Sequence, residues 1–151
     1  MIPQPCYCGS GELYSHCCAP YLAQQKIAPS AEKLMRSRFT AYAIQNTDYL
    51  LSSWHPKTRP ENLDAVKEQT SSWLHLKIYF TNKGSTSDQT GTVAFIATYT
   101  DNNKQYHLCE KSYFEQIENK WYYHNGDILT PSKNSDCLCG SKKKFKRCCG
   151  K

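Results

Sequence analysis

The residues best suited to chemistry are the cysteines, of which the chain has 9 among 151 residues. Eight of them lie in two segments near the ends of the chain, residues 6–18 and 137–149. The segments read CYCGSGELYSHCC and CLCGSKKKFKRCC, and they align without gaps at an offset of 131 residues. All four cysteines, a Gly-Ser pair and one aromatic residue (Tyr14 or Phe145) coincide. The chain therefore contains an internal repeat of a small cysteine-rich module.

Four thiolates at this spacing are typical of a closed, tetrahedral zinc site, which leaves no position open for reaction chemistry. The glycine after the first two cysteines permits a tight turn whose backbone N–H groups approach the sulfur atoms. A module of about 14 residues is too small to fold by apolar burial, so metal binding would supply its stability, on the order of 10 kcal/mol. We therefore predict two structural Zn²⁺ sites, with these ligands: Cys6, Cys8, Cys17 and Cys18 in the first, and Cys137, Cys139, Cys148 and Cys149 in the second.

Other interpretations of the cysteines stay open. The thiols could hold no metal, they could hold another thiophilic ion or an iron–sulfur cluster, or they could form disulfides. A tight hairpin with adjacent cysteines suits one small ion better than a cluster. Because the N-terminal segment lacks the basic and apolar regions of a secretory signal, we expect a cytoplasmic location, where disulfides rarely persist. His16 precedes one cysteine pair, but Arg147 stands at that position of the other copy, so we expect His16 to bind no metal.

Both segments resemble the SEC-C motif, the small zinc-binding module at the C-terminus of the preprotein translocase ATPase SecA. The C-terminal copy is the closer match, with its lysines and Phe145 ahead of Cys148-Cys149-Gly150. The N-terminal copy departs from the motif at Glu12-Leu13 and at Ala19, but it keeps all four cysteines. In SecA-type proteins the motif contacts other proteins, including an acidic chaperone. The resemblance therefore implies a protein-binding role for the basic copy.

The positive charge of the chain is concentrated in this second module. The formal net charge is +6, of which residues 136–151 carry +5. Because a four-thiolate zinc site carries −2, two filled sites would lower +6 to +2. RNA phosphates are an alternative partner, but the only aromatic residue among the cations is Phe145, which we assign to the core of the module. We expect a protein partner to contact these cations: Lys142, Lys143, Lys144, Lys146 and Arg147.

The residues between the two modules must supply the domain that carries them. Ser30 can cap a helix that begins at Ala31, and an apolar stripe at helical spacing predicts that this helix continues as far as residue 55, before Pro56. A second short helix is predicted over 60–70. The pattern then changes to four strands, 73–81, 89–100, 105–117 and 120–125, separated by turn sequences. Helices followed by an antiparallel meander predict an α+β domain with helices packed on one face of the sheet. No segment reaches the roughly 18 apolar residues of a membrane helix.

This arrangement resembles the nuclear transport factor 2-like fold, a cone in which a curved antiparallel sheet and helices enclose a cavity. The whole chain is similar to the YchJ family of bacterial proteins, which combine that fold with SEC-C motifs. The likeness rests on AEKLMRSRF at 31–39, Trp54-His55-Pro56, EKSYF at 110–114 and WYY at 121–123. The family commonly has a histidine before the glutamate, where this chain has Cys109. The resemblance implies zinc motifs at 1–20 and 133–151 around a cone-shaped domain at 21–132, and a homodimer through the outer sheet face.

Alternation along the third predicted strand places Leu108, Glu110, Ser112 and Phe114 on one face, so we expect Glu110 to face the cavity. A carboxylate in an apolar cavity can act as a general base. The alternative is that it pairs with an arginine, Arg36 or Arg38.

Trp54 and His55 are the other candidates for a site in the cavity. Cys109 has no evident histidine partner, and we expect it to be a small buried apolar residue. The chain has no Ser-His-Asp set and no phosphate-binding loop. We therefore predict a binding or adaptor protein rather than an enzyme. The alternative is a small enzyme or ligand carrier that uses the cavity around Glu110 and Trp54.

Overall fold

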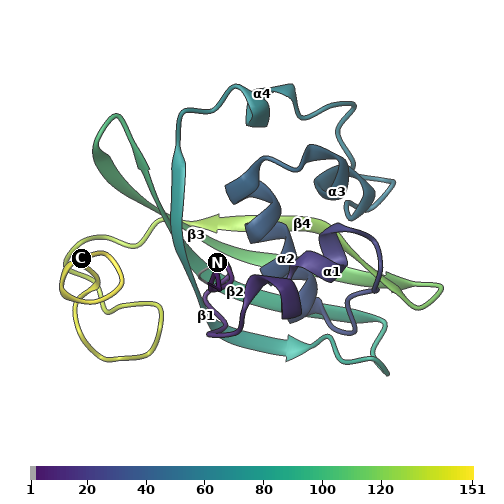
Figure 1. Cartoon of the computed structure of the whole chain (residues 1–151). Helices are drawn as coiled ribbons and strands as arrows, with labels where there is room; N and C mark the ends of the chain where they lie inside the picture. Colours follow the sequence, from purple (N-terminus) through teal and green to yellow (C-terminus); the bar gives the residue numbers. More distant parts are fainter. Residues whose placement is uncertain (1–2) are drawn as a thin grey trace.

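The structure is a computed structural model and describes residues 3–151. Its centre is an antiparallel sheet in the order β1-β2-β3-β4, preceded by helices that lie on one face (Figure 1). The predicted α+β arrangement is confirmed. The strands are β1 (Ser72–Lys83), β2 (Thr90–Asp101), β3 (Lys104–Ile117) and β4 (Lys120–Leu129). The helices are α1 (Ala19–Leu22), α2 (Ala31–Ile44), α3 (Thr47–Ser52) and α4 (Asp64–Lys67), and each cysteine module contains one 3-10 turn, η1 (Tyr14–His16) or η2 (Phe145–Arg147).

Two tight turns set the register of the sheet. Asn102 and Asn103 have φ angles of 50° and 66°, and Glu118 and Asn119 have φ angles of 50° and 67°. Two successive positive φ angles are the geometry of hairpin turns that match the twist of a sheet, and asparagine tolerates them well. The predicted turns at 101–103 and 118–119 are therefore confirmed. The β2–β3 pairing that follows runs without a bulge.

The single helix predicted from residue 31 to residue 55 is wrong. Ser30 does cap its start, accepting a hydrogen bond from the Lys33 N–H at 3.1 Å, but α2 ends where Gln45 adopts a left-handed φ of 60°. The side chain of Asn46 then accepts a hydrogen bond from the Tyr49 N–H at 3.0 Å and begins α3. The helix predicted over 60–70 shrinks to α4, in which Val66 is the one buried residue. A helix with so little apolar contact is stable only as a short turn.

The two faces of the sheet carry different cores. On the inner face, α2 contributes Leu34 and Phe39 to a cluster that includes Phe95 and Phe114 of the sheet. On the outer face, Ile96 and Cys109 pack against Cys137 and Phe145 of the C-terminal module. The N-terminal cysteines belong to the inner cluster. The two copies of the repeat therefore attach to opposite faces of one sheet, as Figure 1 shows. Within residues 3–151, no helix has the length and apolar character needed to cross a bilayer.

Candidate metal centres and central cavity

Each group of four cysteines brings its sulfur atoms together, with all four Sγ atoms within 4.8 Å of one another. A tetrahedral ion with Zn–S bonds of about 2.3 Å separates its sulfur ligands by about 3.8 Å. The sulfur pairs in contact lie close to this value, so both clusters fit a zinc-sized ion. The pairs are Cys8–Cys17 (3.6 Å) and Cys17–Cys18 (3.9 Å) in the first cluster, and Cys139–Cys148 (3.5 Å) and Cys148–Cys149 (4.0 Å) in the second.

The backbone hydrogen bonds of the two modules repeat at the same offset of 131 residues. The Cys6 N–H donates to the Glu12 carbonyl at 2.8 Å, and the Cys137 N–H donates to the Lys143 carbonyl at 2.8 Å. The first cysteine of each adjacent pair makes the same hydrogen bond. The Cys17 N–H donates to the Tyr14 carbonyl at 3.1 Å, and the Cys148 N–H donates to the Phe145 carbonyl at 3.0 Å. The sequence repeat is therefore also a structural repeat of one hairpin.

One thiol in each cluster has a lowered pKa. Hydrogen bonds from the thiols of Cys18 and Cys6 hold the pKa of Cys8 well below its ordinary value. At the equivalent position, hydrogen bonding by the Ser141 side chain is the largest cause that lowers the pKa of Cys139, to about 6. Burial raises the pKa of Cys17 to about 11. A lowered pKa favours the thiolate form of a cysteine, which is the form that binds a metal ion.

The two clusters differ in their surroundings. The N-terminal cysteines are all buried, and α2 holds their hairpin through the Arg36 Nη1 group, which donates to the Cys8 carbonyl at 2.9 Å. In the C-terminal cluster only Cys137 is buried, and the other three cysteines are half-buried. Cys109, as expected, is a buried residue beneath this second module. His16 is exposed and lies outside the first sulfur cluster.

Residues 30–126 match the family model of the YchJ middle domain, described as nuclear transport factor 2-like. The chain belongs to the YchJ family. The SEC-C motif matches this YchJ-family chain twice, at residues 3–20 and 134–151, which are the two cysteine modules. Its central domain therefore has the predicted nuclear transport factor 2-like fold, and the SEC-C motifs support metal binding by the two clusters.

Two solved structures are similar to this YchJ-family chain. One is the solution structure of a SEC-C motif containing protein from Rhodopseudomonas palustris, with a TM-score of 0.76 and 32% identity, which covers 84% of this chain and 100% of that one. The other is the crystal structure of a SEC-C motif containing protein from Psychrobacter arcticus, with a TM-score of 0.71 and 25% identity, covering 99% of this chain and 96% of that one. Both of these proteins contain a SEC-C motif, and both structures support the fold described above.

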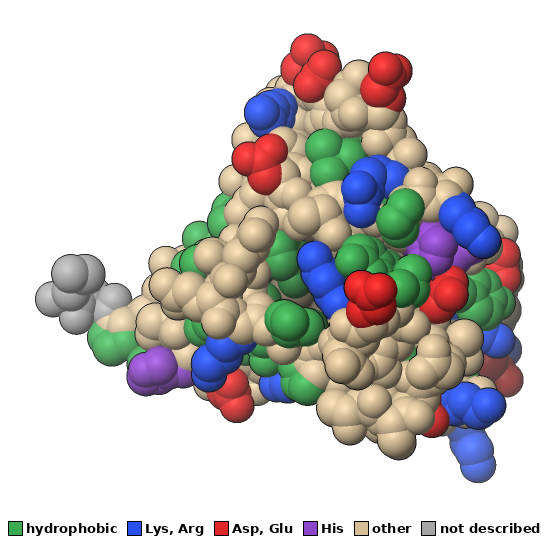
Figure 2. Space-filling model, turned by 90° about the vertical axis from the view of Figure 1, so that its right-hand side faces the viewer, with side chains coloured by type: hydrophobic (Ala, Val, Ile, Leu, Met, Phe, Trp, Pro, Cys, Tyr) green, Lys and Arg blue, Asp and Glu red, His purple; other side chains and the backbone are tan. Residues whose placement is uncertain are grey.

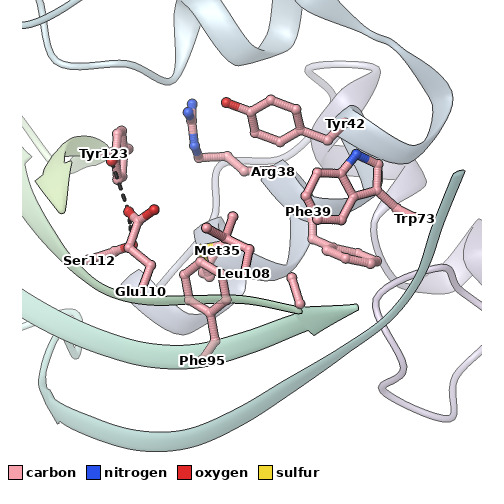
Figure 3. Close-up of a pocket in the computed structure, with 11 residues that line it drawn as sticks. Met35, Arg38, Phe39, Tyr42, Trp73, Phe95, Leu108, Glu110, Ser112 and Tyr123 are labelled. Atoms are coloured by element: carbon pink, nitrogen blue, oxygen red, sulfur yellow. Dashed lines mark hydrogen bonds between the residues drawn. The ribbon is translucent and has the colours of Figure 1, made fainter. Parts of the chain in front are cut away.

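A cavity of about 170 Å³ lies between α2 and the inner face of the sheet. One end is apolar, and the other carries the charged and hydroxyl groups (Figure 3). As predicted from strand alternation, Leu108, Glu110 and Ser112 all face it. The apolar walls include Met35, Phe39, Trp73, Phe95 and Leu108, and the polar end is formed by Arg38, Tyr42, Glu110, Ser112 and Tyr123.

Glu110 is held by hydroxyl groups. Its Oε1 atom accepts hydrogen bonds from Ser112 Oγ at 2.8 Å and from the Tyr123 hydroxyl at 2.9 Å. The carboxylate lies directly over Gly126 of β4, where any larger side chain would collide with it. Burial and the Glu110 charge raise the pKa of Tyr123, which keeps its hydroxyl a hydrogen-bond donor. The alternative considered above, an ion pair of Glu110 with Arg36 or Arg38, is not found among residues 3–151.

Arg38 lies at the same polar end and is 2% exposed. Its Nη1 group donates to the Leu50 carbonyl at 2.8 Å and to Ser53 Oγ at 2.7 Å. The guanidinium carbon lies 4.9 Å from the centre of the Trp54 ring and 4.7 Å from that of Tyr123. Burial lowers the pKa of Arg38. Trp54 therefore contacts Arg38, which lines the cavity, but Trp54 does not line the cavity itself.

His55 does not line the cavity. Its Nδ1 atom accepts a hydrogen bond from the Lys57 N–H at 3.1 Å, so the ring proton is on Nε2, which lies 3.0 Å from a carboxylate oxygen of Glu115. His124 completes a group whose polar atoms lie within 4.8 Å of one another. Because Nε2 carries the proton that Glu115 accepts, this atom is not free for a metal, and the ion pair connects the segment after α3 to β3.

Two residues of the site were not predicted from the sequence. Tyr123 and Gly126 position Glu110, and both lie on β4 opposite the strand that carries it. The two-residue alternation of Trp121 and Tyr123 was the available signal for an inward-facing tyrosine. No local signal exists for Gly126, since Asn125-Gly126 is typical of a turn but lies within the strand.

Proposed function

We propose that the protein is a cytoplasmic adaptor that binds two structural zinc ions and contacts an acidic protein through its C-terminal SEC-C motif. One observation carries this proposal. A groove of about 480 Å³ lies between the outer face of the sheet and the motif, and it has no acidic residue among those that line it. Its cations are Lys77, Lys143, Arg147 and Lys151, and the side chains of His75 and His107 also line it.

Zinc is supported by the donor set and its spacing. Four thiolates with contacts of 3.5 to 4.0 Å suit a tetrahedral ion and leave no ligand position for a substrate. The ions would therefore hold the hairpins together rather than take part in a reaction. Eight reduced thiols also favour the cytoplasm, where disulfides rarely persist.

The charge distribution supports an acidic partner at this groove. The five cations of the motif are exposed, and within residues 3–151 their one ion pair joins Lys144 to Asp136 at 4.0 Å. The face that Figure 2 shows, away from the motif, has scattered basic side chains and gathers acidic ones at the top, near α4. Phe145 is buried and offers no ring for stacking on a base, which favours a protein over RNA as the partner.

Fluorescence anisotropy with a labelled ten-glutamate peptide tests this proposal. We expect binding that weakens as salt is raised and that is lost in the double variant Lys143→Glu, Arg147→Glu. The matched control is Lys57→Glu with Lys67→Glu, which changes the charge equally at two exposed lysines outside the groove. If the control pair weakens binding as much, the groove has no special role. Tighter binding of a ten-nucleotide RNA would favour the nucleic-acid alternative.

A homodimer through the outer sheet face stays a prediction. The C-terminal module covers Ile96 and Cys109 on that face, so a dimer would use the part of the sheet beyond it. Sedimentation equilibrium of the zinc-loaded protein measures the mass directly.

Ligand carriage in the cavity is a second candidate function, favoured by the buried Arg38 and the half-buried Glu110 at one end of a cavity whose other end is apolar. Phenotypes separate it from the adaptor function. If Glu110→Ala abolishes function while peptide binding and stability are intact, the cavity carries the function, as carrier or as enzyme. If deletion of residues 136–151 abolishes function while Glu110→Ala is silent, the adaptor role is supported.

A further inference from the structure

The cavity contains a buried cation whose hydrogen-bonding capacity is only partly used. A guanidinium has five N–H donors. In Arg38 the Nη1 group is engaged by Leu50 and Ser53, at 2.8 and 2.7 Å. Neither Nε nor Nη2 of Arg38 has a hydrogen-bond acceptor among residues 3–151. These two nitrogens form the side-on edge of the guanidinium, which presents two parallel donors.

No carboxylate of the described chain is paired with this edge. Glu110 is the acidic group whose charge acts on Arg38, but Ser112 and Tyr123 bind its Oε1 atom and no Glu110 oxygen lies within 4.0 Å of the guanidinium. The rings of Trp54 and Tyr123 attract the cation but cannot accept its in-plane N–H groups. Arg38 lines the cavity, and Figure 3 shows its guanidinium at the polar end.

The size of the whole cavity fits one aromatic ring. Its walls are the side chains of Phe39, Trp73 and Phe95, with Met35 and Leu108 beside them. The volume is about 170 Å³. A dry protein cavity of about 150 Å³ binds benzene. A six-membered ring with one small substituent is therefore the size of ligand that this space admits.

We propose that the cavity binds a small aromatic monocarboxylate, whose two oxygens accept the Nε and Nη2 hydrogens of Arg38 while its ring packs against Phe39, Trp73 and Phe95. This inference rests on the second function proposed above, ligand carriage. The planar fork of arginine matches a carboxylate in two parallel hydrogen bonds, and the pair compensates a charge that the protein has removed from water. Glu110 is a negative charge at the same polar end of the cavity, so it repels a second carboxylate and the site disfavours dicarboxylates.

Isothermal titration of the full-length, zinc-loaded protein with benzoate and with benzamide tests the proposal, because the two probes have the same size and differ in charge. We expect benzoate to bind at least about tenfold more tightly, and its addition to shift the ¹⁵N signal of Arg38 Nε. Equal affinity for both probes would overturn the carboxylate assignment and leave ligand carriage standing. Absence of binding by either probe would overturn the proposed ligand class, whereas ligand carriage itself is tested by the Glu110→Ala phenotype given above.

Two variants separate the ligand contact from the structural role of Arg38. Arg38→Lys keeps a charge but lacks the fork, and we expect it to weaken benzoate binding about tenfold or more and benzamide binding little. Because Arg38 also joins α2 to α3, this variant could fail to fold. Ala97 also lines the cavity. Ala97→Leu fills the space without changing Arg38, and we expect it to abolish benzoate binding. Lys33→Gln, which removes a charge from α2 outside the cavity, is the control. Wild-type benzoate affinity in Ala97→Leu would place the ligand elsewhere and refute the proposal.

Discussion

Replacement of Lys142 by glycine is expected to stabilise the C-terminal SEC-C motif. Lys142 has a φ of 68°, in the left-handed region, and Gly11 occupies the same position of the N-terminal copy with a φ of 88°. A side chain in this conformation costs about 1–2 kcal/mol. Glycine loses about 0.5–1 kcal/mol more conformational entropy on folding. The difference is a stabilisation of about 0.5–1 kcal/mol, which is about two- to fivefold in the equilibrium for opening the motif.

Native-state hydrogen exchange measures this equilibrium at two amides. The Cys137 N–H donates to the Lys143 carbonyl at 2.8 Å, and the Cys148 N–H donates to the Phe145 carbonyl at 3.0 Å. Both bonds break when the hairpin opens, so Lys142→Gly should increase their protection about two- to fivefold. The reciprocal change, Gly11→Lys, should lower the protection of the equivalent amides of the N-terminal copy by a similar factor.

Lys143→Gly is the matched control, because it removes the same charge at the next residue, whose φ is not positive. There the entropy cost of glycine acts alone, and protection should fall. If Lys142→Gly and Lys143→Gly change protection in the same direction, the argument from φ is wrong, and the charge of the hairpin controls its stability instead.

Three further predictions concern metal content, the cavity and pH. Elemental analysis should find two zinc ions per chain in wild type and in Cys109→Ser, but fewer in Cys8→Ser; a metal content that is unchanged in Cys8→Ser would contradict the ligand assignment. Gly126→Ala should displace the Glu110 carboxylate from its hydroxyl partners and lower the free energy of unfolding by about 1–3 kcal/mol in urea titrations. Burial raises the pKa of Tyr49 from 10.0 to about 12, so the unfolded chain loses this proton first. The free energy of unfolding should therefore be unaffected by Tyr49 below pH 10 and decrease from pH 10 to about 12, and Tyr49→Phe should reduce that decrease.

The secondary structure was predictable where the signal is local. Asn102-Asn103 and Glu118-Asn119 mark turns because their backbone angles depend on their own side chains, and the structure has both turns. The break between α2 and α3 was missed because Gln45 is an ordinary helix residue, and its left-handed conformation depends on the packing of both helices. The strand predicted over 120–125 continues to Leu129 in β4. Asn125-Gly126 is typical of a turn, but here the glycine lies within the strand and leaves space for the Glu110 side chain of the neighbouring strand.

The features of the cavity site were likewise predictable only where they depend on local sequence. The inward direction of Glu110 followed from alternation along one strand, which is a property of the extended backbone. The hydrogen-bond partner of Glu110 could not be predicted in this way, because Tyr123 lies on the next strand. The hydrogen bonds of Arg38 could not be predicted either, because its acceptors, Leu50 and Ser53, lie in and just after another helix. The presence of Glu110 and Arg38 in one domain suggested an ion pair, but the distance between their side chains is set by the packing of α2 against the sheet.

By itself, the sequence determined the two groups of four cysteines, because a hairpin of this size brings its own ligands together whatever surrounds it. It also determined the family, the order of helices and strands, and the excess of positive charge in the last module. Only the tertiary structure decided that one module lies in the inner core and the other on the outer face of the sheet. It also decided that a buried arginine lies at one end of a ring-sized cavity. Both depend on contacts between residues far apart in the chain, and short-range patterns do not record which distant surfaces meet.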